Sequence, residues 1–207
     1  MTLLRKTSEN KTEPKHKLRQ ARAAVLACLI IILSCTWALA SPSAEPDASL
    51  ISKLKLAAAD ARSFDNHYDA QVWLAAKDFH LAKLIKNADD RLQLLSLIHS
   101  EASRAKLAPE IVLALIEVES GFDPYAVSSA GAQGIMQVMP FWKSEIGRPQ
   151  DNLINTQTNL RYGCTILKHY LDLEQGRLAE ALARYNGSYG QTWYAERVLD
   201  AWAERWR

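Results

Sequence analysis

Cysteine is scarce in this chain. Two of its three cysteines, Cys28 and Cys35, lie in an N-terminal apolar run, so Cys164 has no partner for an internal disulfide after residue 40. No catalytic motif surrounds Cys164, and its place in a helical pattern predicts a buried, unpaired thiol.

Strand alternation and metal-ligand spacing are also missing. From residue 50 onward the apolar residues recur every three or four positions, which is typical of amphipathic helices. The histidines His67, His80 and His99 are scattered without the spacing of a metal site, and no phosphate loop or internal repeat occurs. The sequence therefore predicts an all-α protein with no metal and no other cofactor.

Charge is distributed unevenly. Residues 1–22 carry seven Lys or Arg and two Glu, residues 23–40 carry no charge, and residues 41–207 carry 18 basic and 21 acidic side chains. A slightly acidic body does not have the basic surface of a nucleic-acid-binding protein. We therefore expect no nucleic-acid partner.

Residues 1–40 are typical of an export leader, with a basic start, an apolar run and Ala38-Leu39-Ala40 before Ser41. A cleaved signal peptide is the first interpretation. An uncleaved membrane anchor is the second, because 18 uncharged residues just suffice to span a bilayer. A lipid-modified Cys35 is the third, although Leu33 fits that pattern poorly. All three place the rest of the chain in the periplasm or cell envelope.

The remaining chain divides into a short linker, a helical region to residue 100, and a C-terminal domain at 101–207. The stripe Leu50, Leu54 and Ala58 predicts a first helix. Further helices are expected from Tyr68, over Ala88–Lys106, near 141–147, over about 156–174, over 179–185, and over 193–206. Gly163 lies inside one of these helices, and we expect another helix to pack closely against it.

Two glutamates end the helix expected between Pro109 and Gly121, and helical geometry separates them. Glu119 falls on the apolar side of the helix, while Glu117 falls on the opposite side with Glu110 and should be solvated. Burial raises the pKa of a carboxyl group, which lets it act as a general acid near neutral pH. Because a carboxylate is unfavourable at a helix C-terminus, Glu119 needs a compensating partner.

The segment that follows is rich in small residues and contains one amide in an apolar run. Gly131 and Gly134 allow close approach of the backbone to a ligand or to another element. Gln137, within Ile135-Met136-Gln137-Val138-Met139-Pro140, is either a satisfied core amide or a ligand contact.

The residues Glu119-Ser120-Gly121-Phe122 and the segment from Ala126 to Pro140 resemble the soluble lytic transglycosylase family. The resemblance continues through Asn159-Leu160-Arg161-Tyr162-Gly163 and Tyr185-Asn186-Gly187, and then Tyr194, Arg197 and Val198, with Ser188 where many members have glycine. It implies a lysozyme-like helical catalytic domain that cuts the glycan strands of peptidoglycan. Residues 41–100 then form a helical N-terminal extension.

The resemblance also implies roles for single residues. Glu119 would be the acid and then the base that closes a 1,6-anhydro ring on N-acetylmuramic acid. Ser128 and Gln137 would contact substrate, Tyr185 would support the intermediate or the glutamate, and Asn186 would line the cleft. A single carboxylate suffices when the acetamido group of the substrate assists. A goose-type lysozyme that uses water and a non-catalytic peptidoglycan-binding protein of envelope assembly remain the alternatives.

Overall fold

The computed structural model describes residues 52, 63–64 and 66–207, which belong to one compact unit, residues 46–207. The expected leader and the stripe Leu50, Leu54 and Ala58 lie outside the described residues. The helices are α3 (His67–Leu81), α4 (Ala88–Arg104), α5 (Pro109–Ser120), α6 (Trp142–Ile146), α7 (Thr156–Leu173), α8 (Leu178–Asn186), α9 (Trp193–Ala201) and a π-helical turn, η2 (Trp202–Trp206).

Side-chain caps set the starts of three helices. The side chains of Asn66, Asn87 and Asn155 accept hydrogen bonds from the first-turn N–H groups of α3, α4 and α7. Pro109 begins α5, where its missing N–H costs nothing, and Gly121 ends α5 with a left-handed φ of 59°. The expected helix positions are confirmed to within a few residues.

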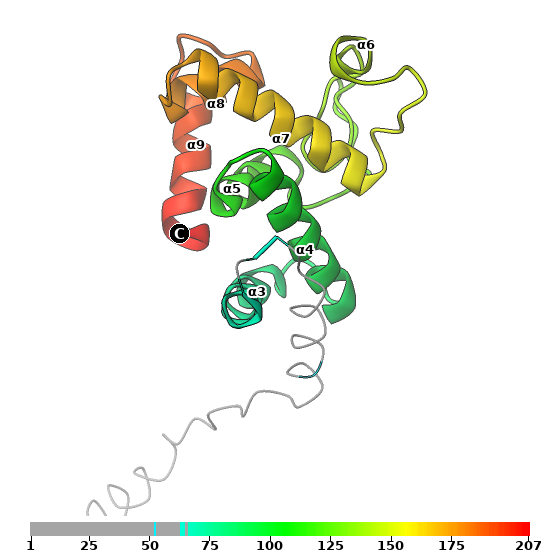
Figure 1. The fold of residues 1–207 in the computed structure, drawn as a ribbon. Helices are drawn as coiled ribbons and strands as arrows, with labels where there is room; N and C mark the ends of the chain where they lie inside the picture. Colours follow the sequence, from blue (N-terminus) through cyan, green and yellow to red (C-terminus); the bar gives the residue numbers. More distant parts are fainter. Residues whose placement is uncertain (1–51, 53–62, 65) are drawn as a thin grey trace, which may run out of the picture. The chain divides into compact units, whose positions relative to one another are not determined.

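Helix α5 is the centre of the fold and is buried on every side over half its length. All residues from Ile111 to Ile116 are buried. The helix packs against α4, α9 and η2, while α7 packs against α4 and α8 (Figure 1). Six consecutive buried residues show that the apolar surface of α5 is not limited to one stripe. The apolar surface of α5 is therefore wider than the one apolar side that helical geometry predicts.

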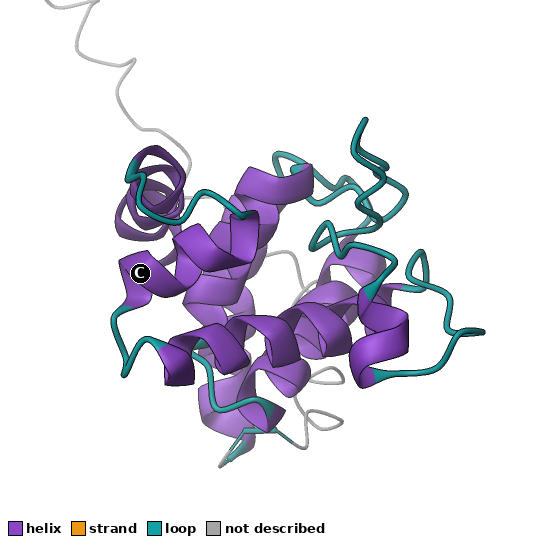
Figure 2. Cartoon of the chain, turned by 90° about the horizontal axis from the view of Figure 1, so that it is seen from above, coloured by secondary structure: helices purple, strands orange, loops and turns teal. Residues whose placement is uncertain are grey.

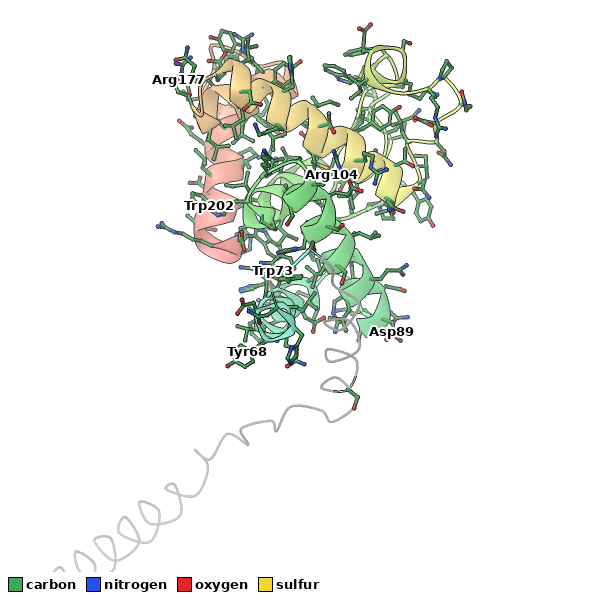
Figure 3. The ribbon with its side chains drawn as sticks, in the orientation of Figure 1. Tyr68, Trp73, Asp89, Arg104, Arg177 and Trp202 are labelled. Carbon is green, nitrogen blue, oxygen red and sulfur yellow. The ribbon has the colours of Figure 1, made fainter. Side chains whose placement is uncertain are left out.

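Helix α3 is tied to this centre by two long-range hydrogen bonds. Trp73 Nε1 donates to Glu110 Oε1 at 2.6 Å, and Lys77 Nζ donates to the carbonyl oxygen of Trp206 at 2.6 Å. In Figure 3, Trp73 lies on the side of α3 that faces the central helices, and Tyr68 lies on the outer side. The region before residue 100 is thus joined to both α5 and the end of the chain.

The expected domain boundary at residue 100 falls inside α4, which runs unbroken from Ala88 to Arg104. Farther along the same helix, the buried carboxylate of Glu101 accepts hydrogen bonds from Arg104 at 2.6 Å and Arg161 at 2.7 Å. These bonds connect α4 to α7, so α4 contacts elements on both sides of the expected boundary.

The described residues contain no β-strand, as Figure 2 shows. Two isolated bridges, Val127 to Gln133 and Gln133 to Val138, are the only extended pairings among the described residues. They fold the segment after α5 into a compact loop. None of the described helices is both long and apolar enough to cross a bilayer.

Gly163 does mark a close contact, but its neighbour is not another helix. A Cβ atom on Gly163 would lie 2.4 Å from Met136 Sδ and 2.8 Å from Met136 Cβ. Met136 belongs to the loop after α5, so the expectation of a packing helix was wrong. The missing side chain makes room for that loop against α7.

Candidate active site

Glu119 lies in the last turn of α5, where its side chain is partly buried. Tyr194, in the first turn of α9, donates its hydroxyl hydrogen to Oε1 of Glu119. Among the described residues, Oε2 of Glu119 has no hydrogen-bond partner. The carboxyl group is therefore fixed through one oxygen and open through the other.

Three influences set the pKa of Glu119, and burial is the largest. Desolvation raises the pKa above the ordinary glutamate value, while the Tyr194 hydrogen bond and the positive charge of Arg197 oppose that rise. The net direction is upward, as expected from the sequence. Tyr194 and Arg197 also supply the compensation that a carboxylate at a helix C-terminus requires.

The phenol of Tyr194 stays protonated over the pH range in which the site would act. Burial and the neighbouring charge of Glu119 raise the pKa of its phenol far above the ordinary tyrosine value. A protonated phenol can donate a hydrogen bond to Glu119 in either state of the carboxyl group. In the sequence Tyr194 is marked only by the family resemblance, and its contact with Glu119 could not be predicted because the two residues lie 75 positions apart.

The loop after α5 is held against the helices by hydrogen bonds at Ile135 and Met136. Ser120 Oγ donates to the carbonyl oxygen of Ile135 at 2.7 Å, and Tyr185 Oη donates to the carbonyl oxygen of Met136 at 2.8 Å. Tyr185 therefore positions the loop, and the hydrogen bond to Glu119 comes from Tyr194 instead. Supporting the intermediate remains a prediction for Tyr185.

Asn159 of α7 is the central brace of the same loop. Its buried side chain accepts from the N–H of Met136 at 2.7 Å and donates to the carbonyl oxygens of Gln133 and Leu153, both at 2.8 Å. A Cβ atom on Gly134 would lie 2.5 Å from Asn159 Nδ2, and Gly134 has a φ of 74°. Glycine is required there on both grounds.

Gln137 adopts a left-handed conformation, with a φ of 50°. Its Nε2 donates to the carbonyl oxygens of Ala126 and Gly134, at 3.1 and 2.9 Å. Both amide hydrogens are thus used inside the loop, and Oε1 is the group left for a ligand. An uncommon backbone conformation that is fixed by the side chain of the same residue is typical of functional positions.

The other two expected contacts have different surroundings. Ser128 Oγ accepts from the N–H of Ala132 at 3.0 Å, so its hydroxyl hydrogen remains available as a donor. Asn186 is exposed and ends α8. No hydrogen bond joins Ser128, Gln137 or Asn186 to Glu119 in the described part of the chain, and their substrate contacts remain predictions.

Glu117 is partly buried and paired, so the expectation of a solvated side chain was wrong. Its side chain is 23% exposed and pairs with Arg205 at 2.8 Å. Trp206 Nε1 also donates to Glu117 Oε2 at 2.6 Å. The turn η2 covers this side of α5, and the helical pattern around Glu117 alone could not show that a distant segment returns there.

Two further expectations concern Cys164 and metals. Cys164 is buried without a disulfide, which confirms the expected buried, unpaired thiol, and burial raises the pKa of that thiol to about 12. The described residues contain no group of three or more His, Cys, Asp or Glu that could hold a metal ion.

Comparison with known proteins identifies the family of this arrangement. Residues 96–201 match the family model described as "Transglycosylase SLT domain", which is half of the chain. The chain belongs to the transglycosylase SLT family. Glu119 and Tyr194 both lie within the matched residues, whereas α3 lies outside them.

Relatives of this SLT-family chain carry consistent names. A membrane-bound lytic murein transglycosylase C of Actinobacillus pleuropneumoniae is 50% identical over 48 residues, which are 23% of this chain and 13% of the relative. The transglycosylase of Enterobacteria phage PRD1 is 30% identical over 100 residues, 48% of this chain and 37% of the relative. A membrane-bound lytic murein transglycosylase C of Yersinia pestis is 28% identical over 130 residues, 54% of this chain and 36% of the relative.

The chain spans well under two thirds of the length of these curated relatives. An inactive mutant of the lytic transglycosylase Slt from Pseudomonas aeruginosa also aligns in three dimensions. It has 18% identity and a TM-score of 0.42, and the match covers 76% of this chain and 34% of that one.

Proposed function

We propose that this chain is an exported lytic transglycosylase that cleaves the β-1,4 bond between N-acetylmuramic acid and N-acetylglucosamine in peptidoglycan without consuming water. The observation that carries the proposal is the partly buried carboxyl group of Glu119, whose pKa burial raises and whose Oε1 is held by Tyr194. Membership of the SLT family supports the same reaction.

The hydrogen bond from Tyr194 supports Oε2 of Glu119 as the reactive oxygen. Because the phenol donates to Oε1, the acidic proton of Glu119 resides on Oε2, the oxygen without a partner among the described residues. In the first step Oε2–H protonates the glycosidic oxygen, and the bond from that oxygen to C1 of the muramic sugar breaks. The acetamido oxygen of the same sugar stabilises the positive charge at C1.

The second step returns the proton. Glu119, now a carboxylate, takes the hydrogen of the C6 hydroxyl, and that oxygen bonds to C1 to close the 1,6-anhydro ring. Glu119 ends protonated, as it began, and no water enters. Tyr194 keeps donating to Oε1 throughout, which lowers the energy of the carboxylate between the two steps.

One carboxylate is sufficient for this route. Asp123 is the acid that follows Glu119 most closely in the sequence, but it is exposed, and its Oδ1 accepts from the N–H of Tyr125 at 2.9 Å in a turn. That arrangement suits a turn residue rather than a second catalytic group. The acetamido group of the substrate takes the role that a second carboxylate has in other glycosidases.

The loop after α5 would present the remaining contacts. Gln137 Oε1 and the hydroxyl of Ser128 would bind the sugars beside the scissile bond, and Asn186 would contact the strand at the end of α8. Tyr185 would keep the loop in place through Met136. The leader at residues 1–40 would deliver the enzyme to the periplasm or cell envelope, by a cleaved signal in preference to an uncleaved anchor.

Product analysis on purified sacculi tests the proposal. The expected product carries an anhydromuramoyl end and is lighter by one water than the product of a lysozyme. A hydrolytic product would instead assign the goose-type lysozyme reaction. Glu119→Gln should abolish turnover while the chain stays folded, and full activity in that variant would reject the assignment of Glu119. Binding to sacculi without any release of product would indicate a non-catalytic envelope protein.

A further inference from the structure

A groove that Glu119 does not line is bounded by α4, the turn after α5 and the start of α7. Its volume is about 640 Å³, which is within the range of small-molecule sites. Helices α4 and α7 pack side by side (Figure 1). Neither Glu119 nor any of the expected substrate contacts lines this groove.

One face of α4 forms a wall of the groove. Asp90, Gln93, Leu94 and Leu97 line it with the spacing i, i+3, i+4 and i+7, so they share one side of the helix. Asp90 and Gln93 are exposed, while Leu94 and Leu97 are partly buried. The wall therefore has an apolar base and a polar upper edge.

The opposite edge supplies an aromatic ring and further amides. Tyr125 is 75% exposed, and Asn155 and Gln157 belong to the start of α7. In the described part of the chain, the side-chain amides of Gln93 and Gln157 have no hydrogen-bond partner. Unused amides on both edges offer donors and acceptors together, above apolar surface.

The charged side chains that line the groove indicate which class of ligand it can bind. Among the described residues that line the groove, Asp90 is the single charged one and none is basic. An anionic ligand would find a repelling carboxylate and no cation, and the ionised carboxylates of a peptide stem would stay unpaired. An uncharged, hydroxyl-rich ligand with apolar faces matches the amides, the leucines and the exposed ring.

We propose that this groove binds a second stretch of N-acetylated aminosugar glycan, apart from the bond that Glu119 cleaves. The choice of glycan as ligand rests on the proposed function. The groove holds the sugar strand through Gln93 and Gln157 on its two edges, with Tyr125 against a sugar face. Such a site keeps the enzyme on the wall between successive cuts.

The groove also borders the catalytic loop. Ile135 lines its floor, and the carbonyl oxygen of Ile135 accepts the hydrogen bond from Ser120, the residue after Glu119. The groove and the end of α5 are thus linked through one hydrogen-bonded segment. A glycan in the groove adds contacts to the segment that carries Gln137.

Amide NMR of the full chain with Glu119→Gln, titrated with the neutral tetramer of N-acetylglucosamine, tests this site directly. We expect shift changes at residues 90–97 of α4 and at 155–157 of α7, separate from those around residues 119 and 137. Absence of changes at 90–97 and 155–157 under saturation would overturn the proposal.

Paired variants then separate this groove from the catalytic centre. Gln93→Ala with Gln157→Ala should weaken binding of the Glu119→Gln chain to sacculi by about tenfold or more, because two hydrogen-bonding groups are lost. The exposed residue Gln150 lies outside the groove, and Gln150→Ala should leave binding unchanged. Equal binding by the double variant and the Gln150→Ala control would contradict the proposal.

Two further experiments identify the ligand and test the groove separately from the proposed catalytic function. A stem peptide without sugars should leave residues 90–97 and 155–157 unshifted, and shifts at those residues with the peptide would assign the groove to peptide instead. If the wild-type chain releases no anhydro product from sacculi while the tetramer still shifts residues 90–97, the proposed function fails and the glycan groove stands.

Discussion

Tyr194 on α9 donates its hydroxyl hydrogen to Oε1 of Glu119 at the end of α5. This bond spans 75 positions of sequence and joins two helices that pack directly on each other. It orients the carboxyl group, stabilises its ionised form and leaves Oε2 open. The catalytic proposal therefore depends on α9 as much as on α5.

Removing the Tyr194 hydroxyl should slow turnover and move the pH profile. Tyr194→Phe deletes a hydrogen bond to a group that becomes charged during the reaction, so kcat/KM should fall about tenfold or more. The hydrogen bond lowers the pKa of Glu119, so its loss raises that pKa further. The general acid then stays protonated to higher pH, and the alkaline limb of kcat/KM should shift upward.

Tyr189→Phe is the matched control, because Tyr189 is exposed and its ring lies 3.8 Å below the guanidinium of Arg184. It should change neither the rate nor the alkaline limb. An unchanged limb in Tyr194→Phe, or a shift of the same size in both variants, would show that Tyr194 does not act on Glu119.

Glu117 should matter for stability and not for chemistry. Glu117→Gln removes the charge that pairs with Arg205 while keeping an acceptor for Trp206, and should cost about 1 kcal/mol of unfolding free energy. Glu117→Ala leaves Trp206 Nε1 without its partner and should cost about 2 kcal/mol. Chemical denaturation measures both, and kcat of the folded fraction should remain at the wild-type value.

Glu204→Gln provides the comparison, since Glu204 pairs with the same Arg205 but is 68% exposed. It should cost less than Glu117→Gln. A reduced kcat in Glu117→Gln at full folding would point to a role of Glu117 in the reaction.

Asn159 should affect both stability and turnover. Asn159→Ala deletes three hydrogen bonds and leaves the N–H of Met136 and the carbonyl oxygens of Gln133 and Leu153 without that partner. We expect a loss of about 3 kcal/mol or more, and a lower kcat because the loop that carries Gln137 loosens. Thermal melts and assays at a temperature where the variant is folded measure the two effects.

Asn159→Asp keeps the size and one acceptor oxygen but replaces the donor that serves two carbonyl groups. Asn159→Asp should lose nearly as much unfolding free energy as Asn159→Ala. Wild-type stability in Asn159→Asp would show that the two donated hydrogen bonds contribute little.

The sequence predicted the features that depend on residues close together in the chain, which are the helix limits, the position of Glu119 and the helical class. The limits of α5 follow from Pro109 and Gly121, and the special position of Glu119 follows from helical periodicity. The helical class follows from the absence of strand alternation. These features need only the 3.6-residue repeat and the conformational preferences of proline and glycine.

Contacts between distant segments could not be read in the same way. Glu117 and Trp206 are 89 positions apart, and Met136 fills the space beside Gly163 although it belongs to no helix. Tyr194 and Asn159 appeared in the resemblance, but nothing in their own surroundings showed which groups they bind. These contacts depend on tertiary packing, which cannot be predicted from composition or from hydrophobic periodicity.

The raised pKa of Glu119 predicts that the catalytic acid weakens the fold at neutral pH. A carboxyl group whose folded pKa lies above its unfolded value binds more protons in the folded state between the two values, so stability falls as pH rises through that window. Glu119→Gln removes this penalty and should unfold at a higher denaturant concentration than the wild type at pH 7. Below the ordinary glutamate pKa the carboxyl is neutral in both states, and the advantage should shrink there. Denaturation at a series of pH values measures the difference, with Glu145→Gln as a control at an exposed carboxylate. An advantage of Glu119→Gln that is equal at acidic and neutral pH would mean that ionisation of the buried acid does not cause it.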